Sequence, residues 1–111
     1  MAKNNEAKVK FTADTEQFNE SLKQVSYNTK ELKSEMKLIE AQMKHGGATI
    51  DNLQSKHDNL SAQLKENENL QEALNNKLEV AVKYFGENST EAQNLRIQLN
   101  NARIAHEKLE S

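Results

Sequence analysis

Histidine is the side chain of this sequence best suited to chemistry, because the chain contains no cysteine and imidazole is the commonest protein ligand for metals. The three histidines are His45, His57 and His106. They form no His-Glu-x-x-His motif and no pair four residues apart, so a zinc site would need three separate segments to converge. His57 and His106 fall on predicted helical seams, where a polar residue more often sets the register of packed helices. We therefore expect no metal and no cofactor.

The other reactive residue types are scattered along the chain. Aspartate and glutamate lie at positions predicted to face solvent, without an isolated pair in an apolar setting that would raise a pKa for acid–base catalysis. Serine and threonine occur without a Gly-x-Ser-x-Gly nucleophile motif. The pair Gly46-Gly47 lacks the lysine and the spacing of a phosphate-binding loop, so a hinge between helices is the better interpretation. We expect no catalytic residue and no enzyme.

The charge pattern bears on possible partners. Fifteen basic and 17 acidic residues give a net charge of −2, and the two signs are interspersed. The densest basic stretch, residues 30–37, is interrupted by Glu31 and Glu35. Nucleic-acid binding is therefore not expected, because it usually requires lysine and arginine gathered on one face. No run of about 18 apolar residues is present, so we expect no membrane span in this segment.

The amino-acid composition limits the kinds of secondary structure that can position these residues. The 111 residues include no proline and only three glycines, and 35% are hydrophobic. Turn-rich sandwiches and barrels need proline and glycine, and the lack of cysteine excludes a disulfide scaffold. What remains is an all-α, elongated protein whose apolar residues form narrow seams.

The first 14 residues differ from the rest. Val9, Phe11 and Ala13 alternate with polar residues, the period of a half-buried strand. We therefore predict a short extended or strand-like N-terminal arm over residues 1–14. Asp14 would then be the N-cap of the first helix, with Gln17 at the capping-box position.

Three heptad-patterned helices are predicted over residues 15–45, 49–85 and 89–110. Glycine usually follows the end of a helix, so the breaks are placed at hinges Gly46, Gly47 and Gly86. Thr49 can cap the second helix, and Asn88 or Ser89 the third. In the second helix the seam weakens at Asn67. The predicted packing seam consists of Phe18, Leu22, Val25, Leu32, Met36, Ile39, Met43, Ile50, Leu53, Leu60, Leu64, Leu74, Leu78, Leu95 and Leu99.

The short connections predict an antiparallel coiled-coil hairpin or a three-helix bundle. The Leu53-to-Leu78 part of the seam is expected to face the Phe18-to-Met43 part. The same seam is also compatible with self-association in a parallel oligomer, which the spacing does not distinguish from antiparallel packing. Disorder is disfavoured because disordered chains do not keep seams this regular. The chain ends without a helix stop signal, which predicts a piece of a longer protein.

One combination of motifs goes beyond a generic coiled coil. The opening Val9-x-Phe11-x-Ala13-Asp14-x-x-x-Phe18-x-x-x-Leu22 is followed by Leu32-Lys33-Ser34-Glu35-x-Lys37, Ala41-Gln42-Met43-Lys44 and the glycine pair. Further on comes Phe85-Gly86-x-x-Ser89-x-Glu91-Ala92-x-x-Leu95. Over nearly its whole length the chain resembles the amino-terminal region of tail tape measure proteins from long-tailed phages and prophages of Gram-positive bacteria.

The resemblance implies a structural role in virion assembly. Proteins of this family are long and mostly helical, occupy the lumen of the tail tube and set its length. The implied partners are tail-tube proteins and tail assembly chaperones, and the implied locations are the virion tail and, during assembly, the host cytoplasm. Two other functions stay open: a coiled-coil protein-binding adaptor unrelated to tail length, and the helical arm of an enzyme. The enzyme arm is disfavoured because the hinge carries only Lys44 nearby rather than a basic tip.

Overall fold

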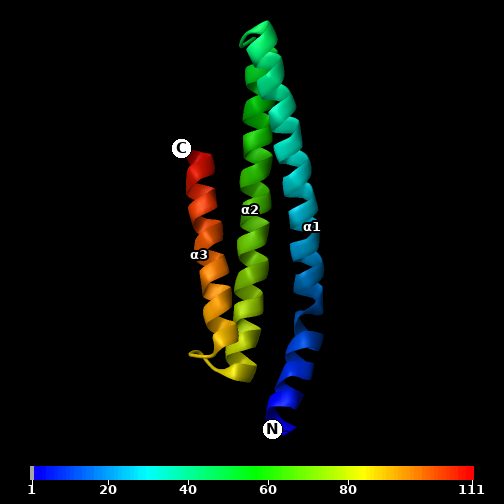
Figure 1. The fold of residues 1–111 in the computed structure, drawn as a ribbon, viewed down its shortest axis with the longest axis vertical. Coiled ribbons are helices and arrows are strands. Elements are labelled where there is room, and N and C mark those ends of the chain that lie inside the picture. The colour runs from blue at the N-terminus through cyan, green and yellow to red at the C-terminus, as the bar shows by residue number, and fades with distance from the viewer. Residues whose placement is uncertain (1) are drawn as a thin grey trace.

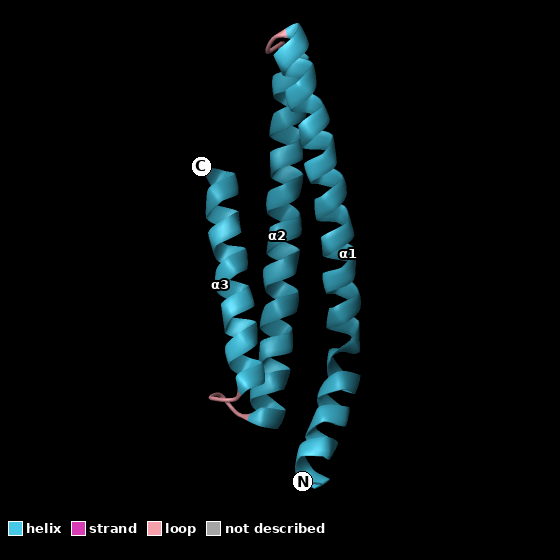
Figure 2. Ribbon diagram, in the orientation of Figure 1, coloured by secondary structure: helices cyan, strands magenta, loops and turns pink. Residues whose placement is uncertain are grey.

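The protein is all-α in a computed structural model that describes the backbone of residues 2–111 and the side chains from residue 5 onward. Helix α1 spans Ala2–Gly46, α2 spans Ile50–Phe85 and α3 spans Thr90–Glu110. No strand occurs within these residues (Figure 2). The prediction of an all-α helical hairpin or bundle is confirmed.

The three helices form a rod with principal extents of 63 × 22 × 16 Å. Helix α2 lies between α1 and α3 and runs antiparallel to both (Figure 1). Helix α3 is the shortest and accompanies only part of α2, so the two-helix end of the rod consists of α1 and α2 alone. Backbone contacts join α1 to α2 and α2 to α3, whereas α1 and α3 do not contact each other directly through the backbone.

The main apolar core lies between α2 and α3. Its buried members are small or leucine side chains, namely Leu74, Ala81, Ala92, Leu95, Leu99 and Ala102. Helix α1 contributes the partly buried Phe11 and Leu22 to the margin of this cluster. The alanines allow the helix backbones to approach closely, while the leucines supply most of the buried apolar area. The three-helix part of the rod therefore contains the continuous hydrophobic core.

The predicted extended arm over residues 1–14 is wrong, because α1 continues through this segment from Ala2. The alternation of Val9, Phe11 and Ala13 does not mark a strand: Val9 is 69% exposed, and Phe11 is half-buried. Phe11, four residues before Thr15, continues the α1 seam toward the N-terminus instead. Its ring packs edge-on against Phe85 with centroids 5.2 Å apart. A helix satisfies its own backbone hydrogen bonds, whereas a lone strand would need a neighbour.

Each of the two turns ends at the residue that caps the following helix. Thr49 accepts a hydrogen bond from the Asn52 backbone N–H at 3.1 Å, and Ser89 accepts one from Ala92 at 3.1 Å. These two caps confirm the predictions, whereas Asp14 lies inside α1 and caps nothing. Gly47 and Gly86 have φ values of 81° and 96°, which glycine adopts at little cost. Gly46 is the last helical residue of α1.

Candidate protein-interaction surface

The histidines do not come together. His45 is exposed at the end of α1. His57 is exposed on α2 with its Nδ1 3.7 Å from the Asp58 carboxylate, and His106 on α3 lies 2.8 Å from Glu110. Over the described residues, no group of three or more His, Asp or Glu side chains is placed to hold a metal ion. The three histidines therefore belong to no shared metal site in the described part of the chain.

Buried amides are the most distinctive polar feature of the rod. Asn59 and Gln63 on α2 are 5% and 6% exposed, although both residue types usually face solvent. Gln63 Nε2 donates to Asn59 Oδ1 at 2.6 Å, and Asn59 Nδ2 donates to the backbone carbonyl of Leu32 in α1 at 2.8 Å. A helical carbonyl can accept this second bond because it has two lone pairs. This amide pair ties α2 to one level of α1.

The same arrangement recurs about two turns further along α2. Gln71 Nε2 donates to Asn67 Oδ1 at 2.7 Å, and Asn67 Nδ2 donates to the backbone carbonyl of Ala102 in α3 at 3.0 Å. Each step of four residues rotates a side chain by about 40° around a helix with 3.6 residues per turn. The two steps from residue 59 to residue 67 therefore carry the asparagine from the α1 side of α2 to the α3 side.

We call Asn59, Gln63, Asn67 and Gln71 the amide ladder. The apolar spacing does not predict this ladder, because it marks Asn67 only as a weak point of the seam. A signal was present, because asparagine and glutamine alternate at four-residue intervals along one helix. Buried polar groups with fixed partners specify the register of packed helices. The ladder accordingly selects one alignment of α2 against both of its neighbours.

A polar hollow of about 370 Å³ lies between α1 and α2. Its wall includes Gln24, Asn28 and Glu66. Asn28 Nδ2 donates to Glu66 Oε1 at 3.2 Å, while the buried Glu66 Oε2 has no hydrogen-bond partner. Most of its lining residues carry amides, hydroxyls or carboxylates, together with Phe18, Val25 and Ala73, so this part of the α1–α2 contact is of mixed polarity.

A second cross-helix link involves the phenol of Tyr84 on α2 and Asp14 on α1. The Tyr84 hydroxyl donates a hydrogen bond to the Asp14 carboxylate. This bond is the main reason that the pKa of Tyr84 is raised above its usual value of 10.0, with additional contributions from partial burial and from the negative charge of Asp14. Asp14 therefore helps to position the N-terminal part of α1, in place of the capping role predicted for it.

The predicted packing seam divides into three groups in the structure. Val25, Met36, Leu74, Leu95 and Leu99 are buried. A second group is half-buried and comprises Phe18, Leu22, Leu32, Ile39, Met43, Leu60, Leu64 and Leu78. Ile50 and Leu53 are exposed to 85% and 49%, so their placement in a packed seam is wrong.

The error at Ile50 and Leu53 has a geometric cause. The stripe of α2 that carries them leads down the helix to Leu74, which packs with α3 residues. Nearer the two-helix end, α2 contacts α1 through Asn59, which donates to the Leu32 carbonyl, rather than through this stripe. Helix α3 does not reach the first turns of α2, and the upper part of the stripe lies uncovered there.

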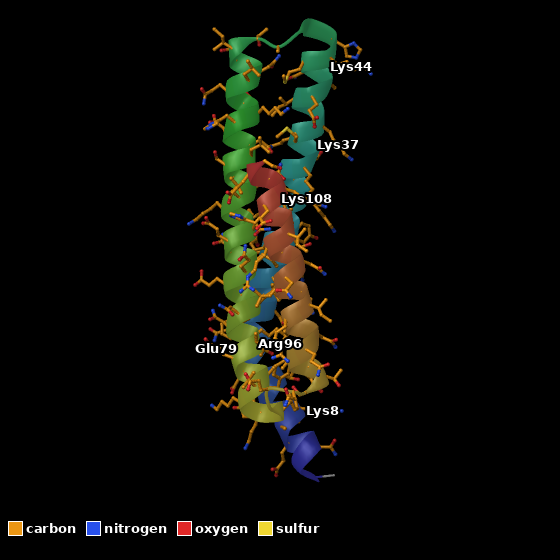
Figure 3. The ribbon with its side chains drawn as sticks, turned by 90° about the vertical axis from the view of Figure 1, so that its left-hand side faces the viewer. Lys8, Lys37, Lys44, Glu79, Arg96 and Lys108 are labelled. Carbon is orange, nitrogen blue, oxygen red and sulfur yellow. The ribbon has the colours of Figure 1, made fainter. Side chains whose placement is uncertain are left out.

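Charged side chains project outward from all three helices along the rod (Figure 3). Lys8, Lys37 and Lys44 are exposed on α1, as is Lys108 on α3. Two further apolar residues on α3, Ile97 and Ile104, are 57% and 53% exposed on its outer side. The described surface therefore mixes solvated charges with isolated apolar residues, and its largest aliphatic exposure is at Ile50.

The chain is thus a helical rod with buried amide side chains that hydrogen-bond between its helices. No family model matches the chain, and searches of curated proteins and of solved structures returned no match. In the part of the chain that the structure describes, none of the helices has an apolar stretch that could cross a bilayer.

Proposed function

We propose that this chain is a structural coiled-coil segment of a phage tail tape measure protein, which helps to set tail length and scaffolds assembly of the tail tube. The single observation that carries the proposal is the combination of the Val9–Leu22 opening and the Phe85-Gly86 break with a rod made almost entirely of helix. Tail-tube proteins and tail assembly chaperones are the partners on this proposal, in the virion tail and in the host cytoplasm.

A helical chain is physically suited to such a role because residue count converts to length at about 1.5 Å per residue. The folded rod is 63 Å long. The same 111 residues as one continuous helix would measure about 166 Å. The two lengths differ enough to be separated by electron microscopy of tails.

The test is a tandem, in-frame duplication of residues 1–111 within the parent gene, followed by measurement of tail lengths on negatively stained particles. A ruler segment lengthens the tail by about 63 Å if it functions folded and by about 166 Å if it functions extended. Asn75→Ala, an exposed substitution on α2, is the control and leaves tail length unchanged. Tails of unaltered length after the duplication would refute the measuring role.

The exposed Ile50 and Leu53 favour one alternative, a protein-binding adaptor with no measuring role. The reading frame separates the two. A tape measure gene continues far beyond this sequence, with the present pattern at its beginning, whereas an adaptor gene ends near this size. The duplication adds a second distinction, because an adaptor would change partner binding and leave tail length constant.

A further inference from the structure

A second hollow lies between the last turns of α3 and the middle of α1, with α2 as its floor. Its volume is about 330 Å³, near the lower end of the range of about 300–1,000 Å³ that is typical of ligand pockets. Its walls include Thr29 and Lys33 of α1, Leu70 of α2, and Ala105, Lys108 and Leu109 of α3. Figure 3 labels Lys108 at this end of α3. We call this space the junction hollow.

The junction hollow is open because the side chains that border it are too short to fill it. Helices α1 and α3 make no direct backbone contact, so only side chains can occupy the space between them. Nearer the start of α1, Phe11 and Leu22 pack against the α2–α3 core. Seven residues after Leu22 the chain has Thr29, and α3 offers Ala105 on the other side. These small side chains leave an unfilled space at this level of the rod.

The inner surface of the junction hollow suits an apolar group. Leu70 and Leu109 line it and are only half-buried. The amides of Gln63 and Asn67 also line it, but they already donate to the Asn59 side chain and to the Ala102 carbonyl. A ligand that enters here therefore gains free energy by covering apolar area, and it needs no hydrogen-bonding group along its body.

The rim of the junction hollow is positively charged. Lys33 reaches it from α1 and Lys108 from α3, and no aspartate or glutamate is among its lining residues. In the part of the chain whose side chains are described, the ion pairs within 4 Å are both made by histidines, so neither lysine is paired with a carboxylate. The acidic residues in the last turns of α3, Glu107 and Glu110, line a different hollow. The rim can therefore accept an anion.

We propose that the junction hollow binds a small amphipathic carboxylate of the medium-chain fatty acid class. The apolar tail lies against Leu70 and Leu109, where it takes the place of the side chain that Thr29 and Ala105 do not supply. The carboxylate lies at the rim between Lys33 and Lys108, whose flexible stems let both ammonium groups reach it while they stay in water. A neutral or cationic head group is disfavoured, because the rim offers two positive charges and no negative one.

The ligand links two helices that do not otherwise touch, and it stabilises the rod by mass action because it binds the folded chain only. The proposal does not rest on the tape measure function, since it concerns a site within one copy of the chain. Unchanged tail lengths after the duplication would leave it intact.

Octanoate is the probe, used below its micelle-forming concentration and at low ionic strength. Nuclear magnetic resonance titration of the ¹⁵N-labelled chain should shift amide signals of residues 29–33, 63–70 and 105–109. Octanoate should bind about fivefold more tightly than 1-octanol, its neutral analogue of equal chain length, and octylammonium should bind more weakly still. Shifts centred instead on the exposed Ile97 and Ile104 would overturn the proposal, as would equal binding of octanoate and octylammonium.

Two pairs of variants locate the head and the tail of the ligand. Lys33→Met removes the charge and weakens octanoate binding by about fivefold, whereas Lys30→Met, at an exposed lysine that does not line the hollow, leaves it unchanged. Ala105→Trp fills the hollow and lowers the affinity by more than about tenfold. Its control is Ala41→Trp, since both alanines are exposed and neither change removes a buried group.

A melting curve by circular dichroism checks that each variant is folded, and Thr29→Leu fills the hollow from α1 should Ala105→Trp fail to fold. The proposal is overturned if Lys33→Met and Lys30→Met have equal effects on octanoate binding. It is also overturned if a folded variant with a filled hollow binds octanoate as tightly as the natural chain.

Discussion

Replacing Asn59 by alanine tests the role of the amide ladder. Asn59 is 5% exposed, donates to the Leu32 carbonyl and accepts from Gln63. The substitution removes both hydrogen bonds and leaves the amide of Gln63, itself 6% exposed, without that partner. A hydrogen bond contributes about 1 kcal/mol net, and a buried polar group left unpaired costs about 1–3 kcal/mol.

Alanine also forms helices better than asparagine by up to about 0.7 kcal/mol, which partly masks the loss. Asn75→Ala provides the matched control, because Asn75 is exposed on the same helix and gains the same propensity. Relative to this control, we expect Asn59→Ala to lower the free energy of unfolding by about 2 kcal/mol. For a chain of this size that corresponds to a melting temperature lower by about 8 °C.

Thermal unfolding followed by circular dichroism at the helical band measures this difference directly. A melting temperature for Asn59→Ala within about 2 °C of that of Asn75→Ala would refute the reasoning. It would mean that the buried Asn59 contributes no more to stability than the exposed Asn75. A double replacement of Asn59 and Gln63 by leucine extends the test. It removes donor and acceptor together, so stability is retained or increased while the selection of a single register is weakened.

Three further predictions follow from individual contacts. Leu74→Ala in the α2–α3 core lowers the free energy of unfolding, measured by chemical denaturation, by about 2–5 kcal/mol. Leu53→Ala lowers it by less than about 1 kcal/mol, because Leu53 is exposed. Equal effects of the two substitutions would contradict the placement of the core around Leu74. Folding raises the pKa of Tyr84, so the stability contributed by its bond to Asp14 is fully present below the unfolded pKa of 10.0 and is lost as the pH rises through the folded pKa. The melting temperature of Tyr84→Phe should therefore fall less with rising pH than that of the natural protein. An identical fall in both proteins would exclude the bond to Asp14 as its cause. Gly86→Ala strains a turn at φ +96° and destabilises the rod by about 1–2 kcal/mol in the same assay; an unchanged or increased stability would show that the turn does not require glycine.

The sequence predicted the elements well because their signals are local. Three helices and their breaks follow from apolar spacing, the lack of proline and the glycines at residues 46, 47 and 86. The caps Thr49 and Ser89 act within one turn of their own helices. The strand predicted near Val9 failed for a related reason: alternation over the five residues from Val9 to Ala13 is too short to distinguish a strand from a helix with one half-buried residue per turn.

The interaction surfaces were less predictable because they depend on competition between helices. The apolar spacing predicts that the leucines and isoleucines of the seam lie in the interface, and it assigns no interface role to Asn59 or Gln63. Asn59 and Gln63 are nevertheless buried, and Ile50 is exposed. Residue type gives the average free-energy cost of burying a side chain. Which face of a helix is buried, and against which neighbour, depends on the packing of all three helices.

What the sequence alone determined is the one-dimensional pattern: the two breaks between the helices, and the spacing of the apolar residues along each helix. What only the tertiary structure decided is which neighbour receives each face. Helix α2 has a single apolar stripe and two partners, and burial of Leu74, Leu95 and Leu99 directs that stripe toward α3. Helix α1 contacts that stripe at Phe85 and also meets the adjacent face, where the amides of Asn59 and Gln63 must find partners or lose their hydration uncompensated. The spacing of apolar residues is a property of the sequence. Which neighbouring helix covers each face of α2 depends on the free energy of the whole packed rod.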